Sequence, residues 1–216
     1  MATSRKWQGR NCSLVVVVFI LAAVRSEENL AILKTTTQSS NYYSNRYPAS
    51  SAVDGCKNTV LEVGCCSHTA VSGPNTVWWR VDLGQISTID SIQIIYREHW
   101  QIRFAGYHLY VSNTTISPQD GVLCYLDTSI TKDDVQLNVI HQCPYVGRYV
   151  TVYNYRTSPK QYNWYDDSAI LELCEVLVYG CPAGMFGNDN CNQVCSESCY
   201  GGNCNPKTGI CLCKYI

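Results

Sequence analysis

The uneven distribution of cysteines constrains the fold of this chain more than any other feature of its sequence. Of 14 cysteines, seven fall between Cys181 and Cys213, whereas residues 29–179 contain few for their length. A segment as short and polar as residues 181–216 cannot bury an apolar core, so disulfides must hold it together. We therefore predict two structural units, residues 29–179 and residues 181–216, with the boundary at Tyr179 and Gly180.

Residues 1–26 have the features of a secretory signal peptide. Arg5, Lys6 and Arg10 precede an unbroken apolar run at residues 14–24, and Ser26 is a small residue at a suitable cleavage point. The alternative is a membrane anchor, but a helix of this run spans only about 16 Å of a roughly 30 Å hydrocarbon core. We thus expect a secreted, extracellular protein that does not insert into a membrane.

Export has a consequence for the cysteines. Cleavage removes Cys12, so 13 of the 14 cysteines enter an oxidising compartment, where disulfides are favoured over zinc sites. An odd number leaves at least one cysteine without an intramolecular partner.

The larger unit has the periodicity of β-strands. Residues 91–96 place alternate apolar side chains on one face, and residues 149–153 alternate β-branched and aromatic residues. The apolar phase shifts after Leu173, which predicts a β-bulge near Cys174 and Glu175. Since no long segment has helical periodicity, we predict an all-β sandwich.

Composition and motifs exclude several classes of function. The formal net charge is only -1, so bulk charge favours neither nucleic acid nor an anionic membrane as a partner. The sequence contains no Ser-His-Asp order, HExxH helix or phosphate-binding loop, so we expect a binding protein without enzymatic activity.

Five segments together resemble the F-type (fucose-binding) lectin family, and they occur in the family's order. They are residues 51–55 (SAVDG), 66–69 (CSHT), 78–84 (WWRVDLG), 147–153 (GRYVTVY) and 173–176 (LCEV). The resemblance covers nearly all of residues 29–178 and implies a discoidin-like jelly-roll β-sandwich. It also implies that the partners are fucosylated or related glycans on cell surfaces or glycoproteins.

The family binds fucose through one histidine and two arginines, and the matching residues here are His68, Arg97 and Arg103. Imidazole offers a donor and an acceptor, and guanidinium offers a rigid fork of donors, which suits vicinal hydroxyls. The loop between the arginines departs from the family, because His99 stands where relatives have aspartate and one residue is missing. Relatives also carry adjacent cysteines there, so we expect Trp100 to supply the apolar face for the sugar ring. The alternative is that both arginines are solvent-exposed charges in a loop and bind no sugar.

The resemblance further implies a structural calcium ion, held mainly by backbone carbonyls and by one or two acids. Oxygen ligands in loops suit calcium. The matching positions are Ser51, Asp54, Cys56, Cys65, Cys174 and Glu175. The alternative is that Asp54 only caps a turn.

The same family implies a disulfide between Cys66 and Cys174. We expect Cys124 to pair with Cys143, which leaves Cys56 and Cys65 for each other. Residues 181–216 resemble partial EGF-like repeats of the multiple-EGF and scavenger-receptor type. On that basis we expect Cys181–Cys191, Cys195–Cys204 and Cys199–Cys211, with Cys213 unpaired.

Two expectations remain. Asn113 begins an Asn-Thr-Thr glycosylation sequon, so the protein is expected to be a glycoprotein. Two functions stay open: a secreted, calcium-dependent lectin for fucose or related glycans, and a discoidin-like protein-interaction module that has lost sugar binding. A single shallow sugar site binds weakly, so we expect an oligomer or tandem copies to supply avidity.

Overall fold

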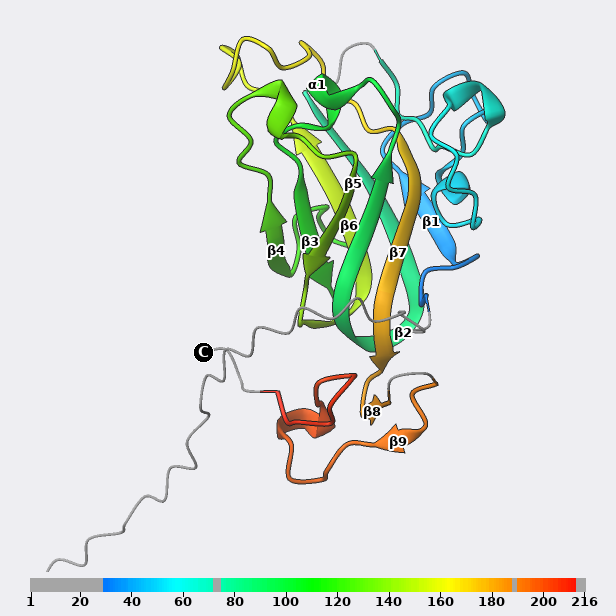
Figure 1. The fold of residues 1–216 in the computed structure, drawn as a ribbon, viewed down its shortest axis with the longest axis vertical. Helices are drawn as coiled ribbons and strands as arrows, with labels where there is room; N and C mark the ends of the chain where they lie inside the picture. The colour runs from blue at the N-terminus through cyan, green and yellow to red at the C-terminus, as the bar shows by residue number, and fades with distance from the viewer. Residues whose placement is uncertain (1–28, 72–74, 188–189, 213–216) are drawn as a thin grey trace, which may run out of the picture.

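The computed structural model describes residues 29–71, 75–187 and 190–212 (Figure 1). The predicted signal peptide, Cys12 and Cys213 lie outside these residues. The strands are β1 (Thr35–Gln38), β2 (Thr76–Tyr96), β3 (His108–Ser112), β4 (Val122–Leu126), β5 (Asn138–Gln142), β6 (Val146–Tyr155), β7 (Leu173–Pro182), β8 (Met185–Phe186) and β9 (Gln193–Val194). The short helices are η1 (Ala49–Ala52), η2 (Leu61–Val63), α1 (Gln101–Phe104), η3 (Lys132–Asp134) and η4 (Tyr200–Gly202).

The predicted all-β sandwich is confirmed, and β2 belongs to both of its layers. The first half of β2 lies between β1 and β6 in the order β1-β2-β6-β3-β4. Its second half pairs with β5 on one side and β7 on the other. All of these pairings are antiparallel, so one long strand joins the two layers (Figure 1).

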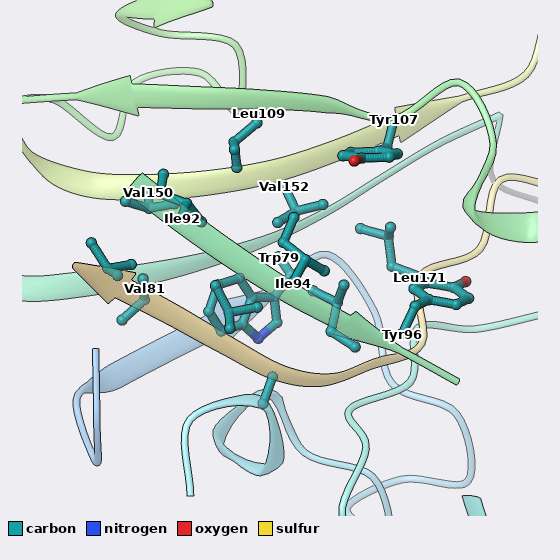
Figure 2. Close-up of a cluster of buried hydrophobic side chains, with 14 of the residues drawn as sticks. Trp79, Val81, Ile92, Ile94, Tyr96, Tyr107, Leu109, Val150, Val152 and Leu171 are labelled. Atoms are coloured by element: carbon teal, nitrogen blue, oxygen red, sulfur yellow. The ribbon is translucent and has the colours of Figure 1, made fainter. Parts of the chain in front are cut away.

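Alternating side chains from both layers form the core (Figure 2). Ile92, Ile94 and Tyr96 of β2 are fully buried, as the alternation in the sequence predicted. Trp79 is also fully buried, and its indole nitrogen donates a hydrogen bond of 2.9 Å to the carbonyl oxygen of Ala49. This bond anchors η1 to the core.

The predicted bulge occurs in β7. Ile95 pairs with Glu175, whereas the next residue, Tyr96, pairs with Leu173, so Cys174 is the extra residue. A bulge re-aims the side chains beside it. It therefore determines how Glu175 is presented at this edge of the sandwich.

The cysteine-rich segment continues directly from β7, which crosses the expected boundary and ends at Pro182. The segment lies at the opposite end of the sandwich from α1 (Figure 1). Lys207 contacts the sandwich by donating a 2.6 Å hydrogen bond from Nζ to Asp90 Oδ2. The two units are thus joined by a continuous strand and by an ion pair.

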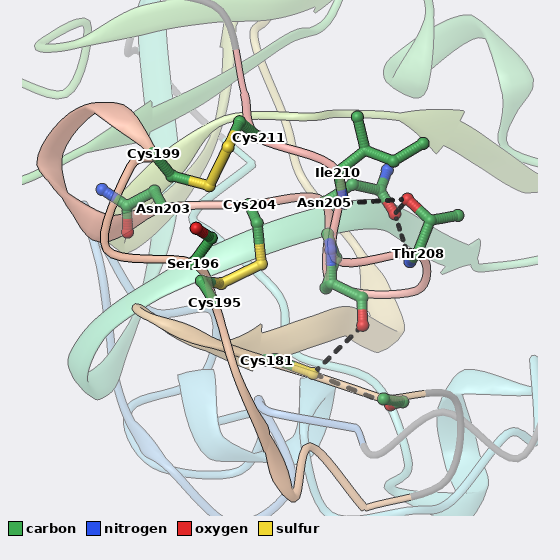
Figure 3. The surroundings of a disulfide bond; sticks show 12 residues. Cys181, Cys195, Ser196, Cys199, Asn203, Cys204, Asn205, Thr208, Ile210 and Cys211 are labelled. Carbon is green, nitrogen blue, oxygen red and sulfur yellow. Dashed lines mark hydrogen bonds between the residues drawn. A yellow bond between two sulfur atoms is a disulfide. The ribbon is translucent and has the colours of Figure 1, made fainter.

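The disulfides join cysteines in the pairs expected from the sequence. They are Cys56–Cys65, Cys66–Cys174, Cys124–Cys143, Cys181–Cys191, Cys195–Cys204 and Cys199–Cys211. Figure 3 shows how two of them lie side by side in the C-terminal segment. Among the described residues, no helix has the length and apolar character needed to cross a bilayer.

Candidate carbohydrate-binding site

A pocket of about 420 Å³ opens at the end of the sandwich that carries α1. Its walls come from residues 42–47, from Leu61 and Glu62, and from the loop between Arg97 and Arg103, with His68 also lining it. The fold therefore brings the three residues predicted to bind sugar into one cavity. Trp100, the predicted apolar contact, lines the same cavity.

Backbone contacts fix where the two arginines sit. Arg97 follows the last residue of β2, and its amide donates a 3.1 Å hydrogen bond to the carbonyl oxygen of Glu172. Arg103 lies in α1, whose carbonyl groups are held by the buried guanidinium of Arg156. That guanidinium donates to the carbonyl oxygens of Ile102, at 3.1 Å, and Arg103, at 2.9 Å.

Glu172 is a member of the site that sequence reasoning missed. Its side chain is completely buried, and Oε1 accepts hydrogen bonds from Arg97 Nη1 at 2.6 Å and Arg103 Nη1 at 3.2 Å. Oε1 also lies 2.8 Å from Nε2 of His68. Burial opposes ionisation, but the hydrogen bond to His68 and the charges of His68 and Arg103 outweigh it, so the pKa of Glu172 is below its usual value.

His68 is oriented by protein groups on every side. Its Nδ1 lies 2.6 Å from the carbonyl oxygen of Thr69, and the ring of Tyr42 stacks on it with centroids 4.4 Å apart. Only 1% of the residue is exposed. Contact between His68 and a sugar stays a prediction.

Trp100 is already in contact with the arginines. The guanidinium carbon of Arg103 lies 3.6 Å from the centroid of the indole ring, and that of Arg97 lies 5.2 Å away. Arginine–tryptophan stacking of this kind is a favourable cation–π contact. The guanidinium of Arg103 therefore covers one face of the indole.

The aromatic wall formed by Tyr42, Tyr43 and Tyr47 was also missed, although three tyrosines within six residues are visible in the sequence. Tyr43 and Ser44 have φ values of 48° and 55°, and His99 across the pocket has 66°. Residues other than glycine are rarely held in this left-handed region, and such strain is concentrated at functional sites. Strained backbone on both sides of the pocket agrees with a binding role.

The loop closed by the Cys56–Cys65 disulfide supplies another part of the wall, through Leu61 and Glu62. It is fastened to the arginine loop because Thr59 Oγ1 donates a 2.8 Å hydrogen bond to Glu98 Oε2. The shape of the pocket therefore depends on this disulfide loop.

The residues predicted to hold calcium lie together at the edge of β7. The amide of Gly55 donates a 3.2 Å hydrogen bond to Glu175 Oε2, which links the turn after η1 to the bulge. Disulfides bring Cys56 to Cys65 and Cys66 to Cys174 in the same region, and Ser51 is buried in η1.

The chemistry of Glu175 fits a cation. Its Oε1 is buried and has no hydrogen-bond partner among the described residues. Burial, together with the nearby charge of Asp54, raises the pKa of Glu175 to about 7. No cluster of three or more histidine, cysteine or acidic side chains with metal-site geometry occurs in the described part of the chain, so backbone oxygens would have to complete a calcium site.

Comparison with known proteins identifies relatives over the sandwich. The family model described as "F5/8 type C domain" matches residues 35–173. Fucolectin-4 of Anguilla japonica is 34% identical over 163 residues, which cover 70% of this chain and 79% of that protein. Fucolectin of Anguilla anguilla is 31% identical over 163 residues, covering 71% of this chain and 91% of the relative.

Solved structures agree with this assignment. A fucolectin from the serum of striped bass, Morone saxatilis, superimposes with a TM-score of 0.58 at 28% identity and covers 71% of this chain. The match covers 47% of that lectin, so the chain spans about half of its length. The lectin domain of lectinolysin, solved with Lewis B antigen, shares the fold with a TM-score of 0.56 at 22% identity, covering 71% of this chain and 96% of that domain.

Proposed function

The chain belongs to the F5/8 type C domain family, and from this premise we propose that it is a non-enzymatic lectin that binds fucose or related glycans in the pocket beside α1. The observation that carries the proposal is the convergence of Arg97 and Arg103 on one buried carboxylate, next to an aromatic wall. Its curated relatives are named fucolectins, and one structural neighbour was solved with Lewis B antigen.

The two arginines and the aromatic wall divide the recognition of a sugar between them. Guanidinium N–H groups donate to hydroxyl oxygens of the ring, and two arginines held in fixed positions select hydroxyls at a matching separation. The wall of Tyr42, Tyr43 and Tyr47 and the indole of Trp100 offer apolar surface to the less polar edge of the sugar. A neutral sugar buried in a shallow pocket gives weak affinity, so avidity from an oligomer is part of the proposal.

We extend the proposal to a structural calcium ion beside the bulge in β7. Glu175 and Asp54 would supply charge, with backbone oxygens from Ser51, Cys56, Cys65 and Cys174 as the matching positions. The buried, unpartnered Oε1 of Glu175 supports this assignment. A cation there would neutralise the two acids and tie the turn after η1 to β7, next to the Cys66–Cys174 disulfide.

The remaining parts of the proposal concern the whole chain. We propose that residues 1–26 are a signal peptide, that the protein is extracellular, and that Asn113 is glycosylated. Asn113 follows β3 and is exposed, which an acceptor site requires. We also propose that residues 181–216 are EGF-like, which their short closed disulfide loops support.

A glycan array, followed by titration with free L-fucose, tests the function. The wild-type protein is expected to bind fucosylated glycans, and Arg97→Ala is expected to abolish that signal. Arg148→Ala is a matched control, because Arg148 pairs with Asp82 and does not line the pocket. A wild-type protein that binds no glycan on the array would favour the protein-interaction function.

A further inference from the structure

We propose that Glu172 is the residue that positions the sugar-binding groups of this pocket, and that His68 acts through Glu172 without contacting the sugar. The inference rests on the proposed function, because it describes how the same pocket is organised. It departs from the expectation drawn from the family resemblance, in which His68 is a direct ligand.

One carboxylate oxygen gathers the three basic side chains of the pocket. Oε1 of Glu172 accepts from His68 Nε2 at 2.8 Å, from Arg97 Nη1 at 2.6 Å and from Arg103 Nη1 at 3.2 Å. Without an anion between them, two guanidinium groups at this spacing would repel each other. Charge-assisted hydrogen bonds to a shared carboxylate fix both the separation and the orientation of the arginines.

Glu172 acts from behind the arginines, because its side chain is 0% exposed and does not line the pocket. It stands immediately before β7, and the carbonyl of the same residue also accepts the amide of Arg97. Side chain and backbone of one residue therefore hold Arg97 at two points. This makes Glu172 a positioning residue.

The ring nitrogens of His68 are both committed to protein oxygens. Nδ1 faces the carbonyl of Thr69 at 2.6 Å, and Nε2 faces Glu172. Both partners are acceptors, so each contact is a hydrogen bond where the ring nitrogen carries the hydrogen. With 1% of the residue exposed and Tyr42 stacked on the ring, neither nitrogen is left for a ligand.

The arginines, by contrast, keep donors for a ligand. A guanidinium has five N–H groups. Within the described residues, the side chain of Arg97 donates through Nη1, and that of Arg103 donates through Nη1 to Glu172 and through Nε to Asp166. Both side chains are partly exposed, at 17% and 14%, and both line the pocket, so their Nη2 groups are available to sugar hydroxyls.

His99 cannot take the role that the family resemblance gives to an aspartate at its position. Its side chain is 86% exposed, and its nearest charged neighbour is Glu98, at 3.8 Å. The anion that holds the arginine pair therefore comes from a different segment, at Glu172, immediately before β7.

The test compares L-fucose affinity among four proteins, each made with the disulfides intact. Glu172→Gln keeps the size of the side chain and removes its charge, and we expect affinity to fall at least about tenfold. Glu197→Gln is the matched control, because it makes the same substitution at an exposed acid of the cysteine-rich segment that does not line the pocket; its affinity is expected to stay within about twofold. His68→Gln retains an amide donor toward Glu172, so it is expected to keep affinity within about threefold of wild type.

A second measurement is independent of whether Glu172→Gln folds. Nitrogen-15 spectra of the wild-type histidine rings, recorded with and without saturating L-fucose, report on hydrogen bonding at Nδ1 and Nε2 of His68. We expect both signals to stay unchanged on adding the sugar, because neither ring nitrogen gains a new contact. A ring nitrogen that changes partner on fucose binding, or a His68→Gln protein that folds but loses binding, would overturn the proposal.

The remaining outcomes separate the positioning role from the function. Wild-type binding that survives Glu172→Gln unchanged contradicts the positioning role and leaves the lectin function standing. Absence of glycan binding by the wild-type protein contradicts the proposed function and, with it, the role assigned to Glu172.

Discussion

Arg103 stacks on Trp100, with the guanidinium carbon 3.6 Å from the centroid of the indole ring. The same guanidinium donates from Nε to Asp166 at 3.2 Å, so it is held by a ring on one side and by an acid on another. Trp100 therefore has two functions in this account: it braces an arginine and it offers apolar surface to the sugar.

Replacing Trp100 separates these two functions. Trp100→Ala removes both the brace and the surface, and it is expected to weaken L-fucose binding by about tenfold, since a stacking contact of this kind contributes roughly 1–2 kcal/mol. Trp100→Phe retains a ring and is expected to lose less affinity. Titration calorimetry on both variants checks this order, and equal affinity of the alanine variant and wild type would remove Trp100 from the site.

The Cys56–Cys65 disulfide is expected to support glycan binding, because it holds the loop that forms one wall of the pocket. The double variant Cys56→Ser/Cys65→Ser frees the loop that carries Leu61 and Glu62, so one wall of the pocket loses its shape. We expect reduced glycan affinity together with a loss of stability of about 2–3 kcal/mol.

The control is the pair Cys124→Ser/Cys143→Ser, which opens a disulfide between residues that do not line the pocket. It should lower the melting temperature while glycan affinity is retained. The disulfide loop would have no role in recognition if the two double variants bound glycan equally well.

Chelation tests the calcium proposal. A cation that binds only the folded state stabilises it by about 2.7 kcal/mol at a hundredfold excess over its Kd. Removing calcium with a chelator should therefore lower the melting temperature. Glu175→Gln should blunt that response, because it removes one of the two charges that favour the ion.

Glu197→Gln, an exposed acid in the cysteine-rich segment, serves as the control and should respond to chelator like the wild type. Identical melting curves for the wild-type protein with and without chelator would argue against a calcium site.

Acidification is expected to destabilise the sandwich through His141. Its Nε2 lies 2.5 Å from the hydroxyl oxygen of Tyr107, and its ring stacks on Tyr125 with centroids 3.6 Å apart. Burial lowers the pKa of His141, partly opposed by the charge of Asp127. The unfolded chain therefore takes up a proton more readily than the folded one, and stability present above about pH 6.5 is lost as the pH falls below it.

Urea unfolding at pH 7.5 and pH 5.5 measures this loss. His141→Gln keeps a hydrogen-bonding group beside Tyr107 and does not titrate, so its stability should fall less between the two pH values. His99→Gln, at an exposed position, is the control and should follow the wild type. An identical pH dependence in all three proteins would exclude His141 as the source.

The sequence predicted the parts of the molecule that local patterns encode. Alternation placed Ile92, Ile94 and Tyr96 in the core, and the phase shift after Leu173 located the bulge. The resemblance to the F-type lectin family also led to Arg97 and Arg103, which the fold brings into one pocket. Each of these features depends on residues that are close in sequence or that belong to a recognisable motif.

The missing parts depend on contacts between distant segments. In the sequence, Glu172 alternates with Leu171 and Leu173, a pattern that places an acid on a solvated face, yet the residue is buried because three basic groups from other loops meet it there. Likewise, the sequence shows several tyrosines between Tyr42 and Tyr47, but only the fold shows that they pack against His68. Local sequence patterns do not predict such contacts between distant segments.

The most direct test of the central claim is calorimetric titration of L-fucose into the wild-type protein, Arg97→Ala and Arg148→Ala under identical conditions. The account predicts saturable binding by the wild type, an unchanged Kd for Arg148→Ala, and a Kd raised by about tenfold to a hundredfold for Arg97→Ala, since each charge-assisted hydrogen bond contributes roughly 1.5–3 kcal/mol. Equal affinities for the wild type and Arg97→Ala would contradict the assignment of the pocket beside α1 as the sugar site.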